Sequence, residues 1–224
     1  MENTVLELKG VTGKRKGFRF TDINMSLKPG FIYAVTGKNG AGKTTLMNCI
    51  LSEKTRYSGQ ICVLGTDVRR NHANVMQVTG FISEDNNFLE LRTGEQNASI
   101  LGLLYEDFDM ELFYGSMKKM GVSPSKTYWR MSRGEKMKFQ LAFAIAHKSR
   151  LYLLDEATAG MDAVFRIELF DMLRELLINE ECCVLMTSHN MTEISKQTDY
   201  VAVMDNGRLG EFAESIEVMD NGKG

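Results

Sequence analysis

The stretch FIYAVTGKNGAGKTTLMNCILS, residues 31–52, joins an apolar run to a glycine-rich turn and then to a helix-like segment. The run at residues 31–35 predicts a buried strand, and the pattern from Lys43 onward predicts a helix. Residues 37–44 fit G-x-x-x-x-G-K-[ST] in the strand-to-helix context that the motif needs. Glycines let successive backbone N–H groups surround a phosphate chain, and the positive end of the helix points at the same anion. The stretch therefore predicts a nucleotide site, in a motif that a kinase, a GTPase and a motor protein would all fit.

The residues of this turn have separate expected roles. Lys43 is expected to place its charge on the β- and γ-phosphates, and Thr44 to offer its hydroxyl to Mg²⁺. The expected nucleotide contacts are Gly37, Lys38, Asn39, Gly40, Ala41, Gly42, Lys43, Thr44 and Thr45.

Two acids and a histidine follow later strands. In LYLLDEA, residues 151–157, four apolar residues precede Asp155 and Glu156, as in a central strand whose carboxyl end meets a ligand. Asp155 is expected to hold Mg²⁺, and Glu156 to polarise the attacking water at the γ-phosphate. His189 ends VLMTSH, a second such strand, which places it beside the same phosphate. We therefore predict catalytic roles for Glu156, His189 and Lys43.

The remaining pattern predicts an α/β fold of the P-loop NTPase type. Alternating apolar residues at 4–11 and 18–27 predict antiparallel strands, and short strands are expected at 59–65 and 79–83. Strands alternating with helices predict a mostly parallel central sheet with helices on both faces. Residues 161–181 predict a helix, 190–197 another, and 200–212 a hairpin with an Asn-Gly turn. In the first of these helices the expected buried face is Val164, Ile167, Leu169, Phe170, Leu173 and Leu176.

Residues 88–148 differ in composition from the rest of the chain and are rich in Leu, Met and Lys at helical spacing. They predict a helical subdomain inserted into one ATPase-type domain, 1–224, whose core comprises 1–87 and 149–224 and begins with an antiparallel β subdomain.

Composition excludes several classes of protein. The 224 residues carry 27 Lys+Arg against 29 Asp+Glu, so a net charge of −2 gives no reason to expect nucleic acid as a partner. No apolar run approaches the roughly 20 residues that span a bilayer, and the first residues do not form a secretion signal. We expect a cytoplasmic protein whose four cysteines are reduced.

The segment MSRGE, residues 131–135, opens a helical pattern. Ser132 followed by Glu135 is a capping-box pattern. Gly134 in the first helical turn costs up to about 1 kcal/mol relative to alanine, which a cap alone does not explain. A capped helix start that a ligand must approach closely is an anion site. A second phosphate site would be redundant for one nucleotide in one molecule, but it is useful if two copies face each other across one ATP.

The order of these motifs resembles the nucleotide-binding subunit of an ATP-binding cassette (ABC) transporter, over essentially the whole chain. GKNGAGKT is similar to the family's Walker A motif, MSRGE to its signature, LYLLDE to Walker B, AGMD to the D-loop and SH to the H-loop. The resemblance implies ATP and Mg²⁺, head-to-tail dimerisation around two ATP molecules, and nucleotide contacts at Ser132, Gly134 and Asp162. The short chain and the residues of its motifs are most similar to those of Gram-positive exporters whose membrane subunits are separate polypeptides.

The chain departs from the family pattern at three places. Arg15, with Phe18 nearby, stands where an aromatic residue usually stacks on adenine, and a guanidinium plane can also stack. Glu84 stands at the usual glutamine of the Q-loop, where a carboxylate can still ligate Mg²⁺ but adds negative charge near the γ-phosphate. The signature has Met131 for leucine, Arg133 for glycine and Glu135 for glutamine, and Arg133 could add charge toward the phosphates.

The resemblance implies an ATPase subunit of an exporter, peripheral on the inner face of the cell membrane. Its expected partners are membrane-spanning permease subunits, docked near residues 84–95, and a second copy of itself or a paralogous ATPase. Two other functions stay open: a non-transport ABC ATPase, and a nucleotide-sensing module with little turnover. The interval between Glu84 and Ser132 is too short for the long coiled coil of many non-transport relatives. The P-loop kinase alternative receives no support from MSRGE or AGMD.

Overall fold

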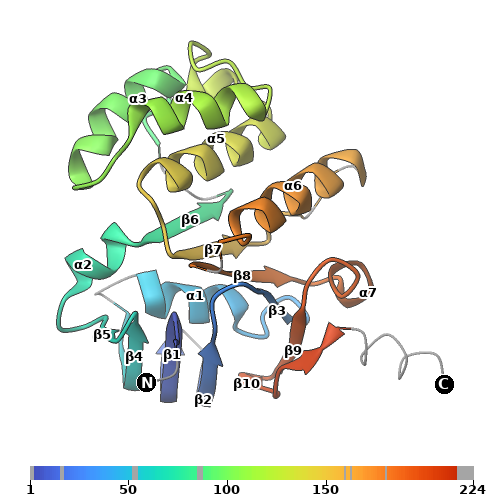
Figure 1. Ribbon diagram of the computed structural model, residues 1–224. Coiled ribbons are helices and arrows are strands. Elements are labelled where there is room, and N and C mark those ends of the chain that lie inside the picture. Colours follow the sequence, from blue (N-terminus) through green and yellow to red (C-terminus); the bar gives the residue numbers. More distant parts are fainter. Residues whose placement is uncertain are drawn as a thin grey trace.

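The computed structural model describes residues 3–15, 18–51, 55–84, 88–158, 160–161, 163–179 and 181–215. These residues form two sheets and a set of helices, with the helical insertion at one end of the molecule and the antiparallel sheet at the other (Figure 1). None of the helices in the described ranges has both the length and the hydrophobicity that crossing a bilayer requires.

The smaller sheet is antiparallel and has the order β2-β1-β4-β5. Its strands are β1 (Leu6–Arg15), β2 (Phe18–Leu27), β4 (Tyr57–Val63) and β5 (Thr66–Asp67). β1 pairs with both β2 and β4 in antiparallel register, which confirms the predicted antiparallel N-terminal strands.

The larger sheet is mainly parallel, in the order β10-β9-β3-β8-β7-β6, and β11 also pairs with β9. Parallel pairing joins β6 to β7, β7 to β8, β8 to β3 and β3 to β9, as predicted. The hairpin from β9 to β10 turns on Asn206 and Gly207, both with positive φ, as an Asn-Gly turn requires. Its strands are β3 (Ile32–Thr36), β6 (Thr79–Ser83), β7 (Leu151–Asp155), β8 (Cys183–Ser188), β9 (Tyr200–Asp205), β10 (Arg208–Leu209) and β11 (Ala213–Glu214).

The two faces of the parallel sheet belong to different hydrophobic cores, because successive side chains of a strand point to opposite faces. Ile32 and Ala34 pack into the core that includes α5 (Arg133–Ala146) and α6 (Ala163–Leu176). Tyr33 and Val35 pack into the core that includes α1 (Lys43–Leu51) and the antiparallel sheet. Figure 1 shows α1 and α6 on opposite sides of this sheet, as the sequence predicted.

The insertion packs around buried aromatic side chains. Phe113, Tyr128, Phe139 and Phe143 are buried, and Phe88 contacts the last three of them with ring centroids 4.8 to 5.4 Å apart. Its elements are α3 (Gly94–Leu101), η1 (Gly102–Leu104), α4 (Met110–Lys119), η2 (Tyr128–Arg130) and α5. These elements all lie within residues 88–148, although the domain boundaries themselves stay predictions.

The predicted buried face of α6 is partly wrong. Val164 and Ile167 are 67% and 56% exposed, whereas Phe165, outside the predicted set, is buried. The buried stripe follows Phe165, Leu169 and Leu173 at four-residue spacing, with Phe170 beside it, so the helix is rotated from the expected phase. Two short helices complete the structure: α2 (His72–Gln77), which the sequence did not predict, and α7 (Met191–Ile194), shorter than the predicted 190–197.

Candidate nucleotide site

The glycine-rich turn lies between the end of β3 and the start of α1. A side chain at Gly37 would lie 2.2 Å from the carbonyl oxygen of Met204, so only glycine fits where the turn passes the neighbouring strand β9. Gly40 has φ +82 and open space around its missing side chain. Thr44 and Gly40 are exposed at this end of the sheet, while α1 runs back into the core. The turn therefore has the open glycine backbone and the helix N-terminus that suit a phosphate chain.

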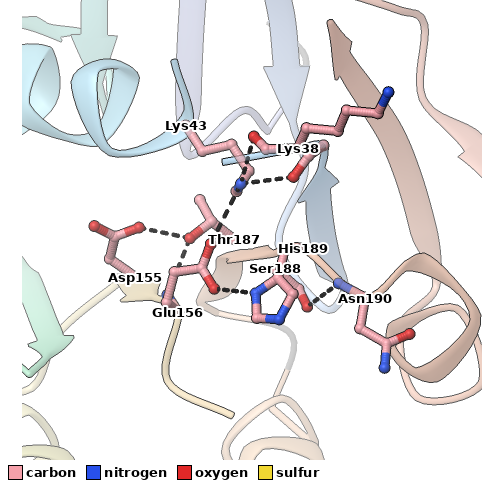
Figure 2. A network of polar contacts seen from close by, with 9 residues as sticks. Lys38, Lys43, Asp155, Glu156, Thr187, Ser188, His189 and Asn190 are labelled. Carbon is pink, nitrogen blue, oxygen red and sulfur yellow. Dashed lines mark hydrogen bonds and ion pairs between the residues drawn. The ribbon is translucent and has the colours of Figure 1, made fainter. Parts of the chain in front are cut away.

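Lys43 is the first residue of α1, and its side chain is only 4% exposed. Its ammonium donates to the carbonyl oxygens of Gly37 at 2.7 Å and Lys38 at 3.3 Å, and it lies 3.3 Å from Glu156 (Figure 2). A lysine is a compact point charge that suits binding to phosphate oxygens. The chain therefore holds one cation where the sequence predicted the β/γ-phosphate contact.

Asp155 ends β7 and Glu156 follows it directly, and Thr187 on the neighbouring β8 connects them (Figure 2). The Thr187 hydroxyl donates to Asp155 at 2.6 Å and accepts the backbone N–H of Glu156 at 3.0 Å. Glu156 has φ +51, a left-handed conformation that is uncommon for residues other than glycine. Thr187 was missed by the sequence reasoning, although a polar residue in the apolar run CCVLMTS was a usable signal.

His189 lies at the end of β8, next to Glu156. Its Nδ1 is 2.7 Å from Glu156 Oε2, while Glu156 Oε1 faces Lys43. The structure therefore brings Lys43, Glu156 and His189 together, although they come from three different strand ends.

A cavity of about 510 Å³ opens over this constellation. Its lining residues are Asn39, Gly40, Gly42, Lys43, Thr44, Thr45, Glu84, Arg133, Glu156 and His189. Most of the residues expected to contact phosphate and metal therefore share one open cavity. Ala41 is buried behind it, and Gly37 and Lys38 contribute carbonyl oxygens to Lys43.

The side chains fit a magnesium ion that is held mainly through phosphates. Among the described residues, no group of three or more His, Cys, Asp or Glu side chains could hold a metal alone. Mg²⁺ is commonly bound by one or two protein oxygens together with substrate phosphates and water. Thr44 and Glu84 line the cavity and Asp155 ends β7 beside it, so the chain supplies hydroxyl and carboxylate oxygens of this kind.

The Ser-Arg-Gly-Glu segment forms a capping box, as predicted. The Ser132 hydroxyl accepts the Glu135 N–H at 3.2 Å, and the Glu135 carboxylate accepts the Ser132 N–H at 2.7 Å. Although partial burial opposes the effect, hydrogen bonds from Lys126 and Ser132 lower the pKa of Glu135. Ser132 is exposed and lies on a second cavity of about 380 Å³, not on the one that contains Lys43.

Gly134 has a packing role that the sequence reasoning did not foresee. A side chain at this position would lie 3.2 Å from the ring of Phe165 on α6. Close packing of two helices therefore accounts for part of the need for glycine, independently of any ligand.

Three of the predicted nucleotide contacts involve residues or side chains that the structure does not describe. Asp162 falls outside the described residues, and the side chains of Arg15 and Phe18 are likewise outside them. The D-loop and adenine contacts therefore stay predictions.

The fold and this constellation together define a P-loop nucleotide-binding protein. A family model described as "ABC transporter" matches residues 20–159. The chain is similar to the ABC transporter ATP-binding protein YtrB of Bacillus subtilis (strain 168), with 28% identity over 89% of the chain and 68% of that protein. It is also similar to the bacitracin transport ATP-binding protein BcrA of Enterococcus faecalis, with 30% identity over 88% of the chain and 64% of that protein. The chain thus spans about two thirds of the length of these relatives.

Solved structures show the same fold. The structure of an ATP-binding subunit of an ABC transporter matches with a TM-score of 0.85 and 21% identity, covering 98% of this chain and 94% of that one. The cbiO1 subunit of Clostridium perfringens, part of the ABC transporter complex cbiONQ, matches with a TM-score of 0.82 and 22% identity, covering 99% and 93%. The chain belongs to the ABC transporter family, as an ATP-binding subunit with ATPase activity.

Proposed function

We propose that two ATPase subunits, either two copies of this chain or this chain and a paralogue, close head to tail around ATP and Mg²⁺. The observation that carries the proposal is the separation of Ser132 from the Lys43 cavity of its own chain. The helix start that Ser132 caps faces solvent and has the polarity to bind an anion. A second molecule turned head to tail would bring this helix start to the terminal phosphate in the opposite cavity.

Within each site, residues of the chain have distinct roles. Lys43 and the backbone of residues 37–45 bind the phosphates, and Thr44, Asp155 and Glu84 hold Mg²⁺, which neutralises developing charge on the phosphates. Glu156 is the general base that polarises the attacking water, and His189 holds the Glu156 carboxylate in place. Ser132 and Gly134 contact the phosphate from the partner subunit.

The remaining contacts complete the same site. We assign the adenine contact to Arg15, stacking by its guanidinium plane, with Phe18 beside it. Asp162 of the D-loop follows Glu156 by six residues in sequence, and we assign it to the nucleotide site at the interface between subunits.

A membrane partner is proposed for the groove between the core and the helical insertion. A cavity of about 390 Å³ lies there, lined from the core by Met76 and Phe81 and from the insertion by Phe88 and Tyr105, among others. Leu104 lines this cavity and is 70% exposed, and the adjacent Leu103 is 85% exposed. The insertion also exposes Leu91, at 84%, ahead of α3. An exposed apolar patch next to a groove suits a protein partner. We infer that the subunit works on the cytoplasmic face of the cell membrane, bound to permease subunits, and this groove supports that proposal.

Export is the proposed direction of transport. The support is the resemblance of the motifs to Gram-positive exporters and the similarity to BcrA, whose name specifies bacitracin transport. A methionine import protein, MetN of Photobacterium profundum, is also similar at 28% identity, so the direction depends on the permease partners.

The test of the shared site is Glu156→Gln. This change removes the base but keeps the size of the side chain, so we expect ATP binding to persist while hydrolysis falls by about a hundredfold or more. ATP should then hold the variant as a dimer in analytical ultracentrifugation, with ADP as the control nucleotide. A variant that stays monomeric in saturating ATP at high protein concentration would contradict the shared site.

A further inference from the structure

Arg133 lies on the same cavity as Lys43 of its own chain, although its neighbours Ser132 and Gly134 do not. It is the first residue of α5, and its long side chain reaches back from the helical insertion toward the core. There its guanidinium forms an ion pair with Glu84, which directly follows β6. Two departures from the family pattern, an arginine and a glutamate, thus contact each other in the phosphate cavity.

The Arg133 guanidinium lies close to the backbone of Gly160. Gly160 has φ +68, and a side chain built there would lie 2.8 Å from Nη1 of Arg133. The guanidinium therefore passes directly over this backbone on its way to the cavity. Arg133 also lines the second cavity with Ser132, so its side chain joins the two sites within one molecule.

The charges in the Lys43 cavity are balanced in pairs. Lys43 lies 3.3 Å from Glu156, and Arg133 pairs with Glu84. The Arg133 and Glu84 side chains are 37% and 55% exposed, so water screens their attraction, and such pairs contribute only about 0 to 1 kcal/mol. This pair is therefore easily exchanged for a stronger one. A terminal phosphate carries more negative charge than a carboxylate, and a guanidinium can bind its oxygens through two parallel hydrogen bonds.

We propose that Arg133 binds the terminal phosphate of the nucleotide held by its own chain, exchanging Glu84 for the phosphate. This inference rests on the proposed function, in which the Lys43 cavity holds ATP. The exchange frees the Glu84 carboxylate, which would then be available to hold Mg²⁺, and draws the N-terminus of α5 toward the core. ADP lacks the terminal phosphate and leaves the ion pair intact, so Arg133 distinguishes ATP from ADP in a single molecule.

The experiment measures equilibrium binding of Mg–ATP and Mg–ADP to the full chain, at concentrations where ultracentrifugation shows a monomer. Arg133→Gln should raise the Kd for ATP by about tenfold, the size expected for one charge-assisted hydrogen-bonding group. The Kd for ADP should stay within about twofold, because ADP makes no contact with Arg133. Arg133→Lys should restore part of the affinity, since the charge remains but the paired hydrogen bonds do not.

Two controls separate the possible failures. Arg130→Gln removes the same charge three residues away, where the guanidinium lies over Trp129, and should change neither Kd. Lys43→Ala should weaken both nucleotides, and if it does not, the proposed function itself fails. Equal losses of ATP and ADP affinity in Arg133→Gln, or none, would overturn the inference alone.

A subunit-mixing test shows which chain Arg133 serves. The test uses ATP well below its Kd for Arg133→Gln, so that this variant alone is nearly inactive. If Arg133 acts in its own chain, a mixed dimer of Arg133→Gln and Lys43→Ala carries one lesion in each site and recovers no activity under these conditions. Recovery on mixing would mean that Arg133 acts on the partner's nucleotide, which contradicts the inference.

Discussion

The Lys43 cavity and the Ser132 helix start are both suited to phosphate, but the chain holds them differently. Lys43 is nearly buried and is tied to two carbonyl oxygens and Glu156, and Glu156 is tied in turn to His189. Ser132 is exposed, and its hydroxyl accepts one N–H of its own helix. Strand ends of one parallel sheet assemble the first site, whereas the second is presented outward from the insertion. The Lys43 cavity is therefore built within the chain, whereas the proposed function assigns the Ser132 helix start to the nucleotide of a second molecule.

The largest expected effect on ATP hydrolysis comes from placing one change at Ser132 and one at Lys43 in two different chains. Ser132→Asp keeps a capping side chain but adds a negative charge that repels phosphate, and Lys43→Ala removes the cradle cation. Each homodimer should lose activity by about a hundredfold or more, as for loss of a group that stabilises the transition state. In a mixed head-to-tail dimer both lesions fall in one site and the other site is intact.

Mixing the two inactive proteins should therefore restore ATP hydrolysis, measured by phosphate release. Each variant remixed with itself is the control. No recovery, under conditions where mixed dimers form, would place Ser132 and Lys43 in the same chain's site.

The two ends of α5 differ in exposure to solvent. Its N-terminus carries exposed Ser132, but His147 at its C-cap is buried, stacked on Tyr105 with ring centroids 4.1 Å apart, and bonded to Ser149. Burial lowers the pKa of His147 to about 4, against about 6.5 for an unhindered histidine. As the pH falls from about 6.5 to about 4, His147 becomes protonated in the unfolded chain but stays neutral in the folded chain. The buried histidine should thus make the protein less stable by roughly 3 kcal/mol between pH 6.5 and pH 4.

Denaturant unfolding at a series of pH values tests this effect. His147→Phe keeps a stacked ring without a titrating group, so its stability should fall less with acid than that of the parent. An unchanged slope in His147→Phe would mean that His147 is not the group responsible.

The features that the sequence predicts are those that depend on consecutive residues or on strand ends, and those that it misses depend on how distant segments pack. The placement of the glycine-rich turn was predictable because its residues are consecutive, and the proximity of Asp155, Glu156 and His189 was predictable because parallel strands end at one edge of the sheet. Their roles stay predictions. The fold class, the hairpin and the capping box are confirmed. Thr187 was missed because its role depends on the placement of β8 beside β7. The Arg133–Glu84 pair was missed because the sequence does not place the insertion against the core.

A smaller effect on turnover is expected from Thr187, which lies beside the Lys43 cavity. Thr187→Val removes the hydroxyl that bonds to Asp155 and to the Glu156 N–H, without changing the shape of the side chain. Glu156 would no longer be held in its left-handed conformation, so turnover should fall by about tenfold, the equivalent of one lost hydrogen bond in the transition state. ATPase assays should show that Thr187→Ser retains most of the activity. Thr198→Val, which removes a buried hydroxyl elsewhere, should affect stability but not turnover.

The smallest expected effect concerns Gly134, where packing and ligand binding give different outcomes. Gly134→Ala gains up to about 1 kcal/mol of helix propensity, but its methyl group crowds Phe165, so the net change in unfolding free energy should be under about 1 kcal/mol. Adding Phe165→Leu relieves the crowding and should return the stability. We expect the double variant, made in the Glu156→Gln background, to be folded but weaker in ATP-dependent dimerisation, because the methyl group also blocks close approach of the partner's phosphate. Dimerisation equal to that of the Glu156→Gln parent and of Phe165→Leu alone would mean that Gly134 serves only the packing of α5 on α6.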